Sequence, residues 1–162
     1  MNVGAGTNPR STARTTPTDP GCTTGTDAGT MMLVATAPAT VVGSHPVFPV
    51  PDLLATAGYY EAVLGFRVVP YLDAAEPHVC LYRDDVEIIL TATTAAVRPN
   101  RELYGYGYDA YFITSGQAEL QAEFEAAGAQ VVRPLGRTDY GNHEFVVEDL
   151  DGRWLAFGLK TG

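Results

Sequence analysis

The chain has 162 residues, 46% of them hydrophobic and 18% charged, which is the composition of one globular domain. Its formal net charge of −9 argues against a nucleic-acid-binding protein, because such proteins present a basic surface. No apolar run approaches the roughly 20 residues that span a bilayer, and Cys22 and Cys80 lie in segments too different to predict a structural disulfide. These features predict a cytoplasmic protein that neither binds nucleic acid nor enters a membrane.

Residues 1–40 differ in composition from the remainder. Thr, Gly, Ala, Pro and Ser dominate residues 1–30, and such a segment has too few apolar side chains to offset the entropy lost on ordering. We therefore expect a disordered leader over residues 1–40, followed by one domain over residues 41–162. Because Met31 and Met32 stand just before that domain, a native start of translation at these positions is a further hypothesis.

The first half of the domain predicts a strand, a helix and three more strands. The strand over 41–50 contains prolines, which places it near a sheet edge or beside a bulge. Asp52 is a suitable N-cap for a helix over 53–64, and Gly65 is a suitable residue to end it. The next three strands are expected over 66–72, 78–83 and 86–93.

The same order of elements recurs after a loop expected over 95–106. A strand over 107–114 leads into a helix over 117–127, which Gly128 ends. The remaining strands are expected over 130–133, 143–148 and 153–159.

Two segments, 45–70 and 109–134, therefore share one pattern of strand, helix, glycine and strand. A unit of this size buries too little apolar surface alone, so two copies are expected to pack as one domain. The sequence predicts an α+β fold of two βαβββ modules, about 41–94 and 107–160.

Three segments resemble the glyoxalase/bleomycin-resistance/extradiol-dioxygenase superfamily, which has the vicinal-oxygen-chelate fold. They are His45-Pro-Val-Phe-Pro-Val-Pro-Asp-Leu, Tyr60-Glu-Ala-Val-Leu-Gly-Phe and Tyr140-Gly-Asn-His-Glu-Phe-Val-Val-Glu-Asp-Leu-Asp-Gly-Arg-Trp. The resemblance covers about residues 41–159. It implies two modules that curl their sheets into a half-barrel around a cavity, and a homodimer with sites between the subunits.

In metal-dependent members of this family, each module donates one ligand from its first strand and one from its last. The resemblance places these four positions near His45, Ile89, Tyr108 and Ala156. An imidazole binds divalent ions, whereas isoleucine and alanine side chains bind none, and tyrosine is a poor ligand unless it is ionised. Glu87 shares a strand face with Ile89, so His45 and Glu87 are weak metal candidates, one short of the usual three protein ligands. The resemblance is therefore greatest to metal-free bleomycin-resistance-type proteins, and no cofactor is expected.

The alternation of side chains along strands then gives an expected cavity lining. Positions 108 and 156 face inward in the family, which places Tyr106, Phe112 and Trp154 on the same side, and the loop before residue 143 adds Tyr140. The expected ligand-binding residues are His45, Val47, Glu87, Ile89, Tyr106, Tyr108, Phe112, Tyr140 and Trp154.

Five other aromatic residues are expected to pack the helices onto the sheets. They are Tyr59, Tyr60, Phe66, Tyr111 and Phe124. Cys80 is expected to be a small buried hydrophobic side chain.

An aromatic and apolar wall with one carboxylate and one imidazole suits a flat, cationic ligand. The predicted function is metal-independent sequestration of a planar aromatic natural product, which would give antibiotic resistance by drug binding. One alternative is a metal-dependent glyoxalase- or dioxygenase-like enzyme that uses His45 and Glu87. Another is a ligand-sensing module without catalysis.

Overall fold

The computed structural model describes residues 40–159, and the described residues from Val41 onward form one compact unit. The leader expected over residues 1–40 lies outside the described residues, apart from Thr40. No helix within residues 40–159 is long and apolar enough to cross a membrane.

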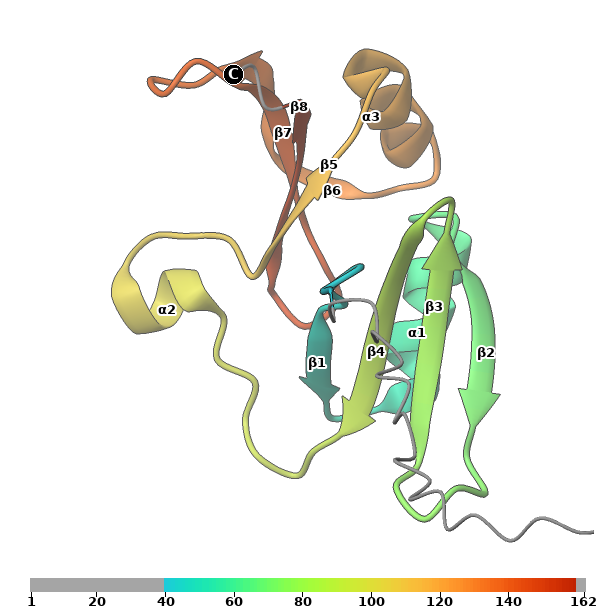
Figure 1. Cartoon of the computed structure of the whole chain (residues 1–162). Helices are drawn as coiled ribbons and strands as arrows, with labels where there is room; N and C mark the ends of the chain where they lie inside the picture. Colours follow the sequence, from blue (N-terminus) through green and yellow to red (C-terminus); the bar gives the residue numbers. More distant parts are fainter. Residues whose placement is uncertain (1–39, 160–162) are drawn as a thin grey trace, which may run out of the picture. The chain divides into compact units, whose positions relative to one another are not determined.

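The first module contains four strands and one helix. They are β1 (Val47–Val50), α1 (Leu53–Ala62), β2 (Arg67–Tyr71), β3 (His78–Arg83) and β4 (Val86–Ala92). The sheet has the order β1-β4-β3-β2, in which β1 runs parallel to β4 and the other pairs are antiparallel (Figure 1). Asp52 caps α1, because its carboxylate accepts the backbone N–H groups of Leu54 and Ala55 at 3.0 Å.

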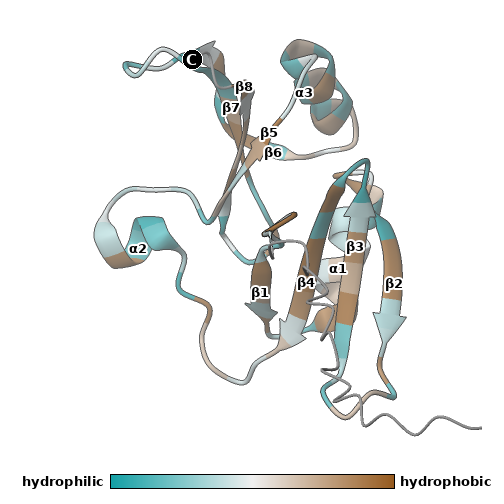
Figure 2. Cartoon of the chain, viewed as in Figure 1, coloured by the Kyte–Doolittle hydropathy of each residue, from teal (hydrophilic) through white to brown (hydrophobic). Residues whose placement is uncertain are grey.

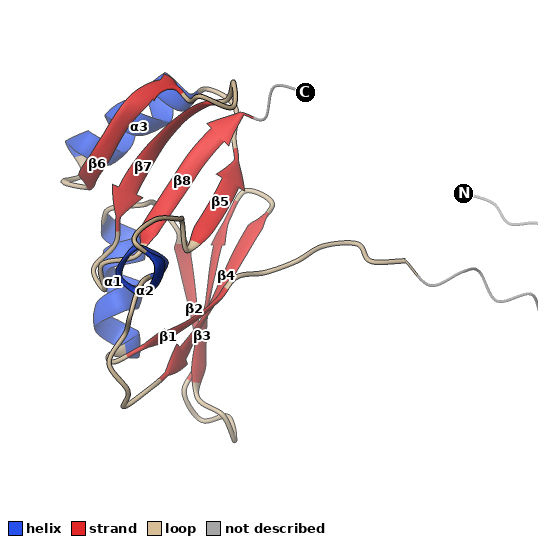
Figure 3. Cartoon of the chain, turned by 90° about the vertical axis from the view of Figure 1, so that its left-hand side faces the viewer, coloured by secondary structure: helices blue, strands red, loops and turns tan. Residues whose placement is uncertain are grey.

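The second module repeats this order after a short helix, α2 (Asn100–Tyr104). Its elements are β5 (Ala110–Ile113), α3 (Gln117–Ala126), β6 (Gln130–Arg137), β7 (His143–Glu148) and β8 (Trp154–Leu159). The sheet order is β5-β8-β7-β6, again with one parallel pair, β5 and β8. Figure 3 shows α3 packed against this sheet. The α+β fold with two βαβββ modules is thus confirmed.

Each sheet has a helix face, which packs against α1 or α3, and an opposite face, called here the open face. The helix faces share one hydrophobic core, in which Tyr60, Phe66 and Phe124 are buried as predicted and Tyr59 packs at the margin. Three phenylalanines from the second module, Phe112, Phe145 and Phe157, stack within it. The brown strand segments in Figure 2 mark where apolar residues concentrate.

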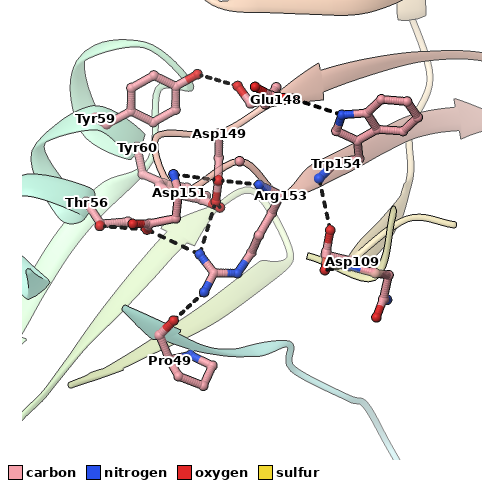
Figure 4. Close-up of polar contacts among 12 residues, drawn as sticks. Pro49, Thr56, Tyr59, Tyr60, Asp109, Glu148, Asp149, Asp151, Arg153 and Trp154 are labelled. Carbon is pink, nitrogen blue, oxygen red and sulfur yellow. Dashed lines mark hydrogen bonds and ion pairs between the residues drawn. The ribbon is translucent and has the colours of Figure 1, made fainter. Parts of the chain in front are cut away.

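A buried polar cluster links the modules (Figure 4). Arg153 is 4% exposed and forms ion pairs with Asp149 at 3.5 Å and Asp151 at 3.2 Å, and its guanidinium also donates to the carbonyl oxygen of Pro49. Asp149 accepts the hydroxyl of Tyr60 on α1 at 2.9 Å. Since these contacts join residues 89 and 104 positions apart, the cluster holds β1 and α1 against the β7–β8 turn.

Some predicted boundaries were wrong. The first strand begins at Val47 instead of residue 41. The strand predicted to end at residue 133 is β6, which continues to Arg137, because irregularities in its pairing with β7 accommodate Pro134 within the strand. The segment predicted as a loop over 95–106 contains α2, which is only five residues long and has no side-chain cap.

Candidate ligand-binding site

The open face of the first sheet brings together two of the predicted polar residues. His45 lies just before β1, and its Nδ1 is 3.3 Å from Oε2 of Glu87 on β4. Glu87 also raises the pKa of Tyr82 by hydrogen bonding to its hydroxyl. The Glu87 carboxylate therefore already has two partners within the first module.

An apolar cavity of about 640 Å³ lies on the same face. Val47 and Ile89, which are paired across β1 and β4, form part of its wall, as does His78 on β3. The His78 ring is stacked on Tyr71 with the ring centroids 4.9 Å apart. This aromatic pair was not among the predicted site residues.

The open face of the second sheet holds a buried carboxylate surrounded by hydroxyl groups. Oε1 of Glu144 on β7 accepts the hydroxyl of Tyr140 at 2.6 Å and also the hydroxyl of Tyr108. Burial and the nearby Glu144 carboxylate raise the pKa values of Tyr108 and Tyr140. Both tyrosines consequently remain neutral donors at physiological pH.

Arg133 on β6 connects this group to Trp154. Its Nη1 donates to the hydroxyl of Tyr108 at 2.5 Å and lies 3.7 Å from Oε1 of Glu144. Its guanidinium carbon lies 5.6 Å from the ring centroid of Tyr108 and 5.9 Å from that of Trp154. These are cation–π distances, so one arginine contacts both rings.

Trp154 is oriented by a second set of contacts, which Figure 4 shows in part. Its indole N–H donates to Oε2 of Glu148, the residue directly opposite on β7, at 3.0 Å. Arg101 from α2 pairs with the same carboxylate oxygen at 2.9 Å and lies 5.4 Å from the tryptophan ring centroid. The ring is therefore held at the open face with part of its surface uncovered.

One predicted site residue, Phe112, faces the wrong side. It is 7% exposed and stacks on Phe157 in the core, whereas Tyr111, which was expected in the core, contacts Tyr108 and Asn142 on the open face. The strand β5 begins only at Ala110, so the alternation counted from residue 108 does not continue into it. Tyr108 lies in the irregular segment before β5 and contacts Glu144 and Tyr140.

The other predicted residues are dispersed. Val47, Ile89, His45 and Glu87 lie on the first sheet, and Tyr108, Tyr140 and Trp154 lie on the second. Tyr106 is 76% exposed in the connection between the modules.

The residues of one chain do not fit a catalytic metal ion. Of the four family positions, only His45 offers a good ligand atom, and the Tyr108 hydroxyl donates its proton to Glu144. Within residues 40–159, no group of three or more His, Cys, Asp and Glu side chains could hold a metal. His45 and Glu87 together supply two ligands.

Sequence reasoning did not identify Glu144, Arg133 or Asn142 as site residues. The sequence does contain a signal for Glu144, which lies between His143 and the apolar run 145–147. Because side chains alternate along a strand, Glu144 lies on the face opposite to that of buried Phe145. Its hydroxyl partners come from separate segments and have no such signal.

Comparison with known proteins identifies the fold. Residues 44–157 match the family model described as "Glyoxalase/Bleomycin resistance protein/Dioxygenase superfamily". No curated protein sequence matches the chain.

Three solved structures illustrate the structural similarity. TioX from Micromonospora sp. ML1 is 23% identical with a TM-score of 0.56, over 74% of this chain and 100% of that chain. An integron cassette protein from the mobile metagenome of V. cholerae is 21% identical with a TM-score of 0.54, over 78% and 100%. A member of the same superfamily from Sphaerobacter thermophilus DSM 20745 is 18% identical with a TM-score of 0.59, over 75% and 98%. At these identities the similarity shows the fold alone.

Proposed function

Because the chain belongs to the glyoxalase/bleomycin resistance protein/dioxygenase superfamily, we propose that it binds and sequesters a planar aromatic natural product on the open faces of its sheets, without a bound metal. A fold shared by enzymes and binding proteins does not decide between them, so the side chains of the site must. The observation that carries the proposal is the group of Tyr108 and Tyr140 on buried Glu144, which Arg133 connects to Trp154.

Aromatic rings at an open sheet face are well suited to a flat ligand. Stacked and edge-to-face ring pairs contribute about 0.5–1.5 kcal/mol beyond the burial of area, and Trp154 offers the largest ring surface. Tyr140 is 60% exposed, so its ring is free to contact a ligand. The apolar cavity with Val47 and Ile89 offers a second surface of the same kind on the first sheet.

The poor metal site supports binding without metal-dependent chemistry. His45 and Glu87 supply two ligands, whereas catalytic metal sites commonly have three protein ligands. Resistance would then arise by mass action, because sequestration lowers the free concentration of a toxic compound. The net charge of −9 would also favour the approach of cationic ligands.

We further propose a homodimer in which the open faces of different subunits enclose the ligand. Both sheets end in strands with a free edge, β1 and β2 in one and β5 and β6 in the other. Val47 on β1 and Ile113 on β5 are exposed hydrophobic residues at 55% and 61%. Light scattering coupled to size-exclusion chromatography measures the mass directly, and a monomer at micromolar concentration would contradict this arrangement.

A titration that follows the fluorescence of Trp154, the only tryptophan, tests the binding function. Metal-free protein is titrated with bleomycin and with a panel of planar aromatic antibiotics, and the series is repeated with zinc, manganese and iron. Saturable quenching in the metal-free series is expected. A response only after addition of one metal would favour the glyoxalase- or dioxygenase-like enzyme, and no response in any series would favour a sensing module.

A further inference from the structure

The second oxygen of the Glu144 carboxylate is a buried acceptor. Oε1 receives two tyrosine hydroxyls, but Oε2 is buried and has no hydrogen bond of good geometry among the described residues. A third hydroxyl, that of Tyr111, lies near this carboxylate, and burial and Glu144 raise its pKa. A carboxylate oxygen that is buried without a donor is costly, and such groups are rare in folded proteins. Glu144 also lies opposite Gly158, where a Cβ atom would lie 2.7 Å from the Glu144 Cβ, so the close approach requires glycine.

This oxygen belongs to a side chain that lines a cavity. The cavity has a volume of about 530 Å³ and is bounded by residues 133–140 and by Glu144. Tyr140, on the β6–β7 hairpin, covers the carboxylate from the solvent side and is itself 60% exposed. Tyr140 and Glu144 both line this cavity, so a ligand in it would lie next to the tyrosine ring and the carboxylate.

The charges around Glu144 leave room for a cation. Arg133 is the only basic side chain within 4.0 Å of the carboxylate among the described residues, and it approaches Oε1 at 3.7 Å. Glu87, the carboxylate expected to bind the ligand, is also paired, with His45 at 3.3 Å, but only Glu144 keeps a buried oxygen without a hydrogen bond among the described residues.

We propose that Glu144 is the recognition anion of the site, and that Oε2 accepts a hydrogen bond from a protonated nitrogen of the aromatic ligand. This inference rests on the proposed binding function and specifies the ligand class as planar aromatic amines or amidines. A charged donor is favoured over a hydroxyl because hydrogen bonds between opposite charges are roughly twice as strong as neutral ones. The rings of Tyr108, Tyr140 and Trp154 contact the planar part of the ligand.

Two dyes of the same ring system test the inference on the full chain. Proflavine is a planar tricyclic cation with amino groups, and acridine has the same rings but is largely uncharged near neutral pH. Equilibrium dialysis gives both dissociation constants for the wild type and for Glu144→Gln, which keeps the size of the side chain and removes its charge. We expect about a 10- to 100-fold weaker binding of proflavine and little change for acridine. Glu119→Gln, at an exposed position on α3, is the matched control.

Arg133→Gln provides an independent variant at a half-exposed position, in case Glu144→Gln does not fold. Removing this competing cation should strengthen proflavine binding by about two- to tenfold and leave the affinity for acridine unchanged. Arg98→Gln, at another exposed arginine, is the control and should change the affinity for neither dye.

Three results overturn the inference. If Glu144→Gln weakens the binding of both dyes equally, or of neither dye, then the carboxylate has a structural role or a water molecule donates to its oxygen. If Arg133→Gln leaves the ratio of the two constants unchanged, no cation lies near Glu144. If the wild type binds neither dye, even at millimolar concentration, the proposed binding function fails with it.

Discussion

Replacing Arg153 by methionine should destabilise the protein more than any surface substitution. The arginine is 4% exposed, and its guanidinium pairs with Asp149 and Asp151 and donates to the carbonyl oxygen of Pro49. It also lies 5.0 Å from the centroid of the Phe48 ring. Methionine keeps much of the apolar contact but leaves two carboxylates without their cation.

The size of the effect follows from the burial of Asp149. Desolvation raises the pKa of this carboxyl, although hydrogen bonds and the charge of Arg153 oppose the shift. Removing one partner of a buried ion pair costs about 3–5 kcal/mol, a large share of the roughly 5–15 kcal/mol that stabilises a typical domain. Because an acid with a raised folded-state pKa destabilises the folded state above that pKa, the loss should shrink as the pH falls toward 3.8.

Urea unfolding followed by circular dichroism measures the loss at neutral pH. The double variant Asp149→Asn with Arg153→Met removes most of the unpaired charge, so it should be more stable than the sum of the single effects by about 0.5–3 kcal/mol. A loss below about 1 kcal/mol for Arg153→Met, or strict additivity of the two substitutions, would refute a coupled inter-module cluster.

Four further substitutions have defined outcomes. Gly158→Ala should destabilise the folded protein by about 1–3 kcal/mol, because the new Cβ would crowd Glu144. Gly58→Ala on α1, where a Cβ would have nothing within 4 Å, should instead stabilise it by about 0.5–1 kcal/mol. Urea unfolding compares the two variants, and equal effects would contradict the close packing at Gly158. The pKa of Tyr59 is raised from 10.0 to about 12, mainly by burial, so the stability that its neutral form contributes is present below pH 10.0 and lost as the pH rises through 12. Tyr59→Phe should show a weaker loss of stability over that interval, and identical pH profiles would refute the assignment. Trp154→Ala should weaken binding of a planar ligand by about 1–3 kcal/mol in calorimetric titration, and an unchanged dissociation constant would remove this ring from the site.

Much of the fold was predictable from local signals. Asp52 predicts the start of α1, and the strands over 78–83 and 143–148 have the predicted bounds because apolar runs and turns delimit them. The error at β5 is also local. The alternation was counted from Tyr108, but residues 108 and 109 lie before β5 and are not extended strand, and this exchanged the faces of Tyr111 and Phe112.

The site was less predictable, because its groups meet only through the tertiary structure. The hydroxyl donors to Glu144 come from the module connection and from the β6–β7 hairpin, and Arg133 comes from a third segment. None of these residues has a spacing that relates it to the others. His45 and Glu87 were predicted as polar ligand anchors and weak metal candidates, and the structure brings them within 3.3 Å of each other because β1 is paired with β4.

The indole N–H resonance of Trp154 tests the central claim most directly. The chain has one tryptophan, so a proton–nitrogen correlation spectrum contains a single indole signal, which reports on the hydrogen bond to Glu148 and on the ring at the open face. Addition of proflavine to metal-free protein should shift this signal saturably and leave the amide of Gly128, at the end of α3, in place. Saturating dye that leaves the indole signal unmoved would contradict aromatic ligand binding at this face.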